Sequence, residues 1–258
     1  MRLGQNFLAD PNLLEAIVRD SGVAAPDCVL EVGAGEGVLT ERLAAVAARV
    51  HVIEIDRGLE PGLTGIAALP NVNLIWADAV RFDFGSLRPP PTAMVANLPY
   101  SVATPVIMRT IFELPSLRRW TVMVQREIAD RLRAEPGSKA YGAPSVLAQL
   151  TGRVSMIRKV SRTVFRPPPR VDSAIISIER DGAGPDERVR ALVRAAFSHR
   201  RKALPRSIDL AVPGLLEPSR EALDRLGIEA GVRAEQLSPP QFAALSAMID
   251  ARPPETAT

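Results

Sequence analysis

Residues 29–37 constrain the fold most, because an apolar run passes there directly into three closely spaced glycines. The run Val29-Leu30-Glu31-Val32 is followed by Gly33-Ala34-Gly35-Glu36-Gly37, and a helical pattern then extends from Val38 to Ala48. Glycine tolerates positive φ and lets backbone N–H groups approach a ligand closely. The order strand, glycine turn, helix therefore predicts the first unit of an α/β sheet with a ligand site at the turn.

The spacing of these glycines and the acids that follow predict which ligand binds. G-x-G-x-G differs from the dinucleotide spacing G-x-G-x-x-G, and an acid precedes the first glycine, which together favour S-adenosylmethionine over NAD. The strand predicted at 50–55 ends in Glu54-Ile55-Asp56, where a ribose diol would lie. Asp78 follows the strand predicted at 72–76 and can accept from an adenine amine. Each acid alone is better explained as a helix cap, but three at successive strand ends favour a site.

The tetrad Asn97-Leu98-Pro99-Tyr100 follows another apolar strand, at 93–97. An exocyclic amine on a planar ring is a poor nucleophile, because its lone pair is delocalised. The Asn oxygen and a backbone carbonyl beside a proline can accept both amine hydrogens and favour a pyramidal nitrogen, while Tyr100 stacks on the ring. A strand-end turn built from Asn and Pro is the competing interpretation, and the tetrad alone does not decide between them.

These motifs and several others occur in one order along the chain. The chain resembles the ribosomal RNA small-subunit (16S) adenine N6,N6-dimethyltransferases, the KsgA/RsmA family, over nearly its whole length. The resemblance is carried by these segments: Leu3-Gly4-Gln5-Asn6-Phe7-Leu8, Glu31 to Gly37, Glu54-Ile55-Asp56, Asp78-Ala79, Asn97 to Tyr100, Gln125-Arg126-Glu127, Tyr141-Gly142, Phe165 to Ser173 and Phe197 to Lys202.

The resemblance implies S-adenosylmethionine as the cofactor and assigns roles to residues. Cofactor contacts are implied for Gln5, Asn6, Leu8, Gly33, Ala34, Gly35, Glu54, Ile55, Asp78, Ala79 and Asn97. Glu54 would hold the ribose and Asp78 the adenine, and Gly33 would lie against the methionine part. The reacting site is implied to consist of Asn97, Leu98, Pro99, Tyr100 and Phe165, with Tyr100 and Phe165 sandwiching a flipped base.

The implied activity is S-adenosylmethionine-dependent dimethylation of N6 on two adjacent adenosines in the 3′-terminal hairpin loop of 16S rRNA, within an immature 30S-type particle whose maturation it assists. Two alternatives stay open. One is a macrolide-resistance-type 23S rRNA adenine N6-methyltransferase, against which Leu98 counts, because those enzymes usually have Ile there. The other is an rRNA-binding assembly factor whose methylation is secondary.

Basic side chains are concentrated in one part of the chain. The formal net charge is only +3, yet residues 153–206 contain 14 Lys and Arg against 5 Asp and Glu. Such clusters suit a phosphate backbone, although a single charge run is more often a solvated helix face. We expect RNA contacts from Arg153, Arg158, Lys159, Arg166, Arg170, Arg200, Arg201 and Lys202.

Composition sets the remaining expectations. The chain of 258 residues has two histidines and one cysteine, Cys28, which predicts neither a metal site nor an internal disulfide. No signal peptide or membrane span is visible, so a cytoplasmic protein is expected. We also expect it to be a monomer.

Alternating strand and helix patterns predict a Rossmann-like class I α/β methyltransferase fold with a small all-helical C-terminal domain. We expect an S-adenosylmethionine-binding catalytic domain at 1–180, a helical RNA-binding domain at 187–251 and a disordered tail at 252–258. Two departures from the family pattern bear on substrate contacts: Ala143-Pro144 stand where relatives have Arg-Leu, and Pro205 is expected to break a helix that relatives continue. In addition, Gly58, Pro61 and Gly62 are expected to weaken the helix after Asp56.

Overall fold

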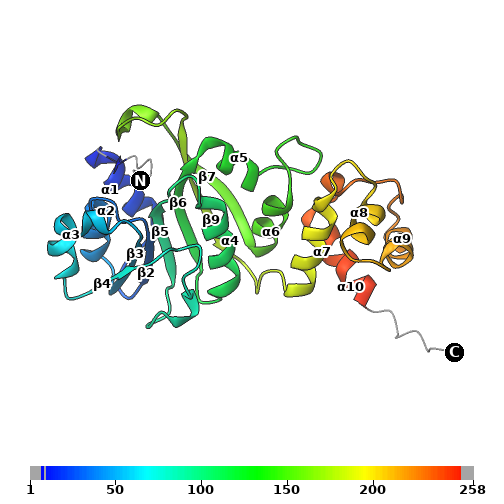
Figure 1. Cartoon of the computed structure of the whole chain (residues 1–258), viewed down its shortest axis with the longest axis horizontal. Coiled ribbons are helices and arrows are strands. Elements are labelled where there is room, and N and C mark those ends of the chain that lie inside the picture. Colours follow the sequence, from blue (N-terminus) through cyan, green and yellow to red (C-terminus); the bar gives the residue numbers. More distant parts are fainter. Residues whose placement is uncertain (1–6, 9, 251–258) are drawn as a thin grey trace. The chain divides into compact units, whose positions relative to one another are not determined.

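The computed structural model describes residues 7, 8 and 10–250. The chain divides into two compact units, one of residues up to Asp130 with Gly152–Ala183, the other of Arg131–Thr151 with the residues from Gly184 on. In Figure 1 the first unit holds the labelled strands and the second holds the yellow to red helices. The residues Gln5 and Asn6 and the predicted tail lie outside the described part.

A seven-stranded sheet with the order β4-β3-β2-β5-β6-β9-β7 forms the centre of the first unit. Strands β4 to β6 in this order are parallel, while β9 runs antiparallel to both β6 and β7. The sheet is thus mixed, with the predicted parallel part at its heart. Its strands are β2 (Cys28–Val32), β3 (Arg49–Glu54), β4 (Val72–Trp76), β5 (Ala93–Asn97), β6 (Arg119–Gln125), β7 (Gly152–Val160) and β9 (Ser173–Arg180).

The central strands are apolar because both of their faces are covered. Every residue of β2 is buried, as is most of β3, β5 and β6, which is the pattern expected of parallel strands between helix layers. The helices of this unit are α1 (Pro11–Ser21), α2 (Val38–Ala44), α3 (Glu60–Ala67) and α4 (Ala103–Glu113), and α5 (Arg126–Leu132) ends just beyond it.

The segment after Asp56 folds more regularly than the sequence predicts. Pro61 lies in the first turn of α3, where no N–H partner is lost, so it starts the helix and does not break it. Leu63 is buried, and both Leu63 and Ile66 pack so closely on Gly37 that a methyl group there would collide with them. Apolar packing therefore outweighs the low helix propensity of Gly62.

A second, two-stranded sheet joins segments that are distant in sequence. Strand β1 (Phe7–Leu8) pairs antiparallel with β8 (Phe165–Arg166), so that Phe7 faces Arg166 and Leu8 faces Phe165. Between the two sheets, β7 ends at Val160, and a 3-10 turn, η3 (Arg162–Val164), precedes β8.

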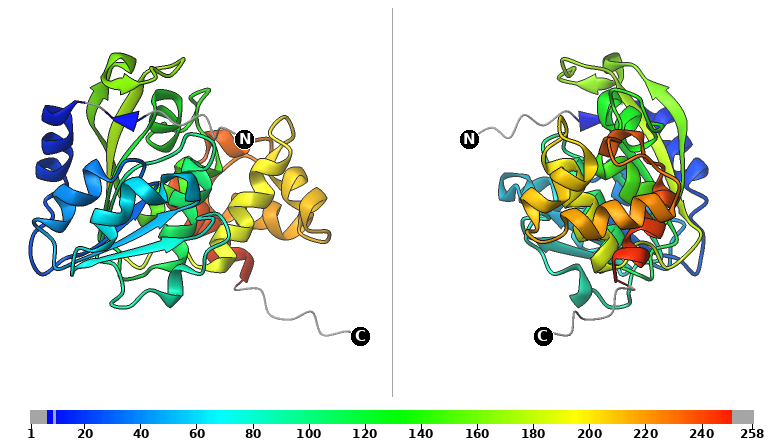
Figure 2. Two further views of the ribbon diagram at one scale, coloured as in Figure 1. Left: turned by 60° about the vertical axis from the view of Figure 1, so that its left-hand side comes forward. Right: turned by 90° about the vertical axis from the view of Figure 1, so that its right-hand side faces the viewer.

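The second unit is helical, as Figure 2 also shows in its yellow to red segments. It comprises α6 (Ala143–Thr151), α7 (Glu187–Ser198), α8 (Leu204–Ala211), α9 (Leu216–Arg225) and α10 (Pro239–Asp250). Pro205 does not break a helix as expected: it lies in the first turn of α8, where no N–H partner is lost, and the preceding helix α7 has already ended at Ser198.

The expected boundary at residue 180 does not describe how residues 131–151 pack. Tyr141 is fully buried and donates a hydrogen bond to Leu237 O at 2.8 Å, and its ring contacts Phe197 edge-on. Gly137 N also donates to Glu235 O. Since these partners belong to the C-terminal helices, the segment contributes to the helical unit, and the predicted first domain is discontinuous.

Candidate active site

A cavity of about 390 Å³ opens at the carboxyl ends of the parallel strands. This is the edge where α/β sheets bind ligands, next to the point where β2 pairs with β3 on one side and β5 on the other. The predicted residues that line it are Leu8, Gly33, Ala34, Gly35, Glu54, Ile55, Asp78, Ala79, Asn97, Leu98, Pro99, Tyr100 and Phe165. The structure therefore brings together every predicted cofactor and reacting-site residue that it describes.

The glycine turn forms as its sequence requires. Gly33 (φ 84°), Gly35 (φ 57°) and Gly37 (φ 79°) all adopt positive φ, and Gly33 N donates to Ile53 O at 2.8 Å. A methyl group at Gly35 would lie 3.1 Å from the Phe7 ring. Glycine is needed here for both its conformation and its small size.

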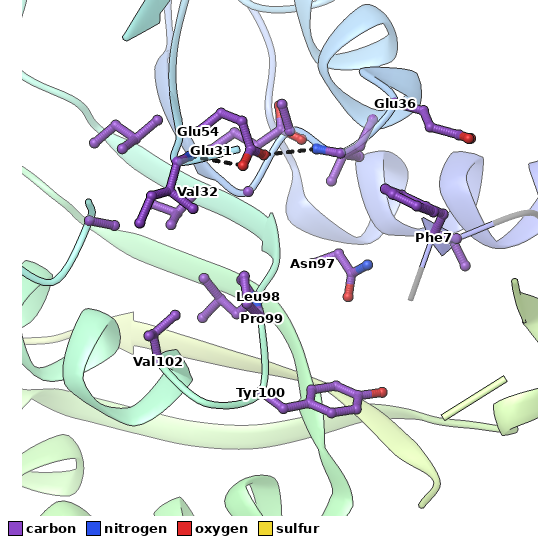
Figure 3. A pocket seen from close by; sticks show the side chains of 18 of the residues that line it. Phe7, Glu31, Val32, Glu36, Glu54, Asn97, Leu98, Pro99, Tyr100 and Val102 are labelled. Carbon is purple, nitrogen blue, oxygen red and sulfur yellow. Dashed lines mark hydrogen bonds between the residues drawn. The ribbon is translucent and has the colours of Figure 1, made fainter. Parts of the chain in front are cut away.

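Glu54 ends β3 with a carboxylate that organises the turn (Figure 3). Its Oε2 accepts from Gly35 N at 3.1 Å, and its Oε1 accepts from Ile55 N at 2.8 Å and Asp56 N at 2.9 Å. The side chain is buried but lines the cavity. Oε2 accepts only one of these bonds and keeps further acceptor capacity, so the group can hold the turn and a ligand hydroxyl together.

Glu31 is the acid for which sequence reasoning gave no site role. It is only 1% exposed, and burial, together with the neighbouring Glu54 charge, raises the pKa of its carboxyl to about 8. Its Oε2 has no hydrogen-bond partner among the described residues, yet the residue lines the cavity. An orphaned carboxyl oxygen in a cavity is a fitting partner for a cationic ligand.

Asn97 and Leu98 present free acceptors at the end of β5. Within the described residues, the Asn97 side chain makes no hydrogen bond, and in Figure 3 it projects to the same side as the Tyr100 ring. Pro99 O accepts from Val102 N at 3.1 Å, whereas Leu98 N donates to Met123 O and Leu98 O accepts nothing from the described chain. The side-chain oxygen of Asn97 and the backbone oxygen of Leu98 are thus both available to accept hydrogen bonds from a ligand.

Comparison with known proteins places this site in a family. A family model described as "Ribosomal RNA adenine dimethylase" matches residues 1–251. The chain belongs to this family. The "Ribosomal RNA small subunit methyltransferase A" of Rubrobacter xylanophilus is 47% identical over 95% of this chain and 92% of its own length. The protein of the same name from Geobacillus thermodenitrificans is 39% identical over 95% and 88%.

Solved structures agree with this assignment of the dimethylase family. A dimethyladenosine transferase from Plasmodium falciparum superposes with a TM-score of 0.78 at 25% identity, covering 93% of this chain and 95% of that one. The 23S rRNA methyltransferase ErmE gives a TM-score of 0.71 at 27% identity, with 95% and 100% covered. The predicted family, enzyme class and class I methyltransferase fold are confirmed.

The two aromatic side chains of the dimethylase site differ in access. Tyr100 lies partly open, and its hydroxyl is 2.6 Å from Ser173 Oγ; burial raises its pKa, so it stays protonated at neutral pH. Phe165 is only 2% exposed, although it lines the cavity, and its strand β8 pairs with β1. A base sandwich between the two rings stays a prediction.

The predicted RNA-binding cations fall into two groups. Arg153 pairs with Glu179 at 2.5 Å and Arg158 with Asp20 at 3.1 Å, while Lys159, Arg166 and Arg170 are exposed in the same unit. Arg200, Arg201 and Lys202 belong to the helical unit, where Arg200 pairs with Glu235 at 3.2 Å. Their contacts with RNA stay predictions.

Sequence reasoning also missed apolar residues of the cavity wall, namely Leu14, Val38, Leu39, Ile53 and Val102. The helical spacing of Val38 and Leu39 after the turn was the only available signal. In the described ranges, no group of three or more His, Cys, Asp or Glu is placed to hold a metal ion. Nor does any described helix have the length and apolar character needed to cross a bilayer.

Proposed function

We propose that the protein is an S-adenosylmethionine-dependent dimethyltransferase acting on N6 of two adjacent adenosines in the 3′-terminal hairpin loop of small-subunit rRNA. The single observation that carries the proposal is the convergence of the Glu54 turn and the Asn97-Leu98 acceptors on one cavity. The relatives named small subunit methyltransferase A, at 39% and 47% identity, support this target over the large subunit.

The residues of the cavity fit this cofactor. Glu54 retains acceptor capacity for ribose hydroxyls, and Asp78 lies at the next strand end for the adenine amine. The glycine turn leaves room for the methionine part, and the unpartnered Glu31 Oε2 suits a ligand that carries positive charge. When bound, S-adenosylmethionine supplies an electrophilic methyl group on a sulfonium.

The chain itself positions and polarises the accepting amine. The Asn97 side-chain oxygen and Leu98 O accept the two N6 hydrogens, which draws the nitrogen lone pair out of conjugation with the ring. Tyr100 stacks on the base and returns about 1–3 kcal/mol toward the cost of unstacking it. No strong base is required, because a nitrogen that has gained a methyl group is strongly acidic and releases its proton to water.

The proposal extends to the biological setting. The protein acts in the cytoplasm, as a monomer, on an immature 30S-type particle, and it assists the maturation of that particle. The excess of Lys and Arg over Asp and Glu in residues 153–206 supports a large polyanionic substrate such as this particle.

The test is incubation with labelled S-adenosylmethionine and small subunits lacking the modification, followed by mass spectrometry of the rRNA. We expect two adjacent dimethyladenosines in the 3′-terminal loop and none in parallel samples of large subunits. Asn97→Ala should lower the rate by about 10² or more while cofactor affinity changes less than tenfold. Asn12→Ala, on the exposed surface of α1, is the control. Methylation of large subunits instead would contradict the proposed target.

A further inference from the structure

Arg109 on α4 connects the helix after the reacting loop to the turn that carries Asp78. Its Nη1 donates to Ala79 O at 2.9 Å and its Nη2 to Phe82 O at 2.6 Å. Glu113, one helical turn further on, holds the same guanidinium through Nε at 2.6 Å and Nη2 at 2.7 Å. The guanidinium carbon also lies 5.0 Å from the centre of the Phe84 ring. The side chain is thus fixed from three directions.

The turn held by Arg109 forms part of the cavity wall. Asp78 and Ala79 line the cavity, and Asp78 O accepts from both Arg81 N and Phe82 N at 2.9 Å. Asp78 Oδ1 accepts from Val80 N at 2.9 Å, which leaves Oδ2 as the less committed oxygen, 3.8 Å from Arg81 Nε. The direction of Oδ2 therefore depends on the conformation of residues 78–82.

We propose that Arg109 is a positioning residue that fixes this turn so that Asp78 Oδ2 meets the 6-amino group of the cofactor's adenine. The inference rests on the proposed function. A planar guanidinium donates in a fixed fork to two carbonyls of one turn while a carboxylate holds its other edge, whereas the three donors of an ammonium all diverge from one nitrogen and lack this planar geometry. Without it, the turn keeps only its short-range hydrogen bonds, and selectivity for a 6-aminopurine falls.

The chain contains a matched control. Arg180 also donates to backbone carbonyls, Leu117 O at 2.7 Å and Ile111 O at 2.8 Å, with longer bonds to Ala183 O at 3.3 Å and Leu114 O at 3.5 Å. Its guanidinium carbon lies 5.1 Å from the Trp120 ring centre. It braces the end of α4 and touches neither Asp78 nor Ala79. Arg180→Met therefore removes guanidinium bonds to backbone carbonyls and a contact with an aromatic ring, as Arg109→Met does, without reaching the adenine turn.

The experiment measures dissociation constants for S-adenosylhomocysteine and for its analogue with unsubstituted purine in place of adenine. Wild-type protein should prefer the adenine ligand by about tenfold or more, the effect of one hydrogen bond to a charged group. In Arg109→Met the preference should fall to about one, because loss of the turn affects mainly the ligand that has the amine. Arg180→Met should keep the wild-type preference even if its melting temperature falls.

Retention of the preference in Arg109→Met, or an equal loss in Arg180→Met, would overturn the inference. Should Arg109→Met not fold, the pair Arg109→Lys and Arg180→Lys gives the same comparison. Reduced preference only in Arg109→Lys would support the inference, and equal behaviour would overturn it. A wild-type protein that binds both ligands equally would remove the role of Asp78. One that binds neither would instead contradict the proposed function.

Discussion

Gly33 and Pro99 lie so close together that a methyl group at Gly33 would be 3.2 Å from Pro99 Cδ. The cofactor turn and the reacting loop therefore share a wall in which neither residue has a flexible side chain. The distance between donor and acceptor sites is set by packing between backbone and a rigid ring.

Gly33→Ala should weaken cofactor binding by about tenfold or more. The positive φ of Gly33 costs an alanine about 1–2 kcal/mol, and the new methyl must displace Pro99. Gly62→Ala is the control, because it lies in α3 with open space around it and should raise stability by about 0.5–1 kcal/mol. Calorimetric titration and urea unfolding measure the two effects. Wild-type cofactor affinity in Gly33→Ala would contradict the tight contact.

Glu31→Gln should change how stability depends on pH. Burial raises the pKa of Glu31 from 4.5 to about 8, so between these values the folded protein retains a proton that the unfolded chain has lost. The free energy of unfolding therefore falls as pH rises through this window, and the variant lacks that contribution. In urea unfolding without cofactor, the free energy of unfolding of Glu31→Gln should rise relative to that of wild type as the pH goes from 5 to 8. Glu36→Gln, in the glycine turn that follows β2 and exposed, serves for comparison. Parallel curves for Glu31→Gln and wild type would refute the assignment.

Tyr100 should contribute through its ring more than through its hydroxyl. Tyr100→Phe loses one hydrogen bond to Ser173, about 1 kcal/mol, and should keep most methylation activity. Tyr100→Ala removes the stacking surface, about 1–3 kcal/mol, which corresponds to roughly 5- to 150-fold in kcat/KM. Steady-state kinetics on small subunits separate the two. Equal losses in both variants would assign the role to the hydroxyl instead.

RNA affinity should depend on salt through the exposed cations. Lys159 is exposed, whereas Arg153 is already paired with Glu179. Lys159→Gln should lower the slope of log affinity against log salt by about 0.7–0.9, the value for one phosphate contact. Arg153→Gln should change it less, because its charge is partly neutralised by the protein. Binding assays over a range of salt concentrations measure both slopes, and an equal decrease in both would show that the ion pair opens on RNA.

The sequence predicted the strands that carry the site well. The strands expected at 72–76 and 93–97 match β4, which is half-buried at the sheet edge, and β5, which is buried, because both are short, mainly apolar runs bounded by loop residues. The acids at their ends were found for the same reason. The role proposed for Arg109 could not be predicted from the sequence. It depends on hydrogen bonds to Ala79 and Phe82, which are about 30 residues away in sequence and contact Arg109 only in the folded chain.

The helical features were harder to predict. Helix α6 was missed, because Ala143 and Pro144 follow a glycine and resemble a loop, although Pro144 suits a first helical turn. The packing of Tyr141 against Leu237 O joins segments 96 residues apart, so no local pattern could assign residues 131–151 to the helical unit. The expectation that Gly62 weakens its helix was wrong for another reason: the apolar contacts of α3 outweigh the low helix propensity of glycine.

The parallel pairing of β2 with β3 has a consequence for how this enzyme can vary. Val32 pairs with Ile53, and the acids Glu31 and Glu54 lie within one residue of that pair. Adding one residue inside either strand would turn its acid to the other face of the sheet, whereas lengthening the surface segment at 57–60 would leave both in place. In laboratory evolution toward other methyl-accepting substrates, insertions should therefore be tolerated in the segments that connect the strands and not within the paired strands themselves.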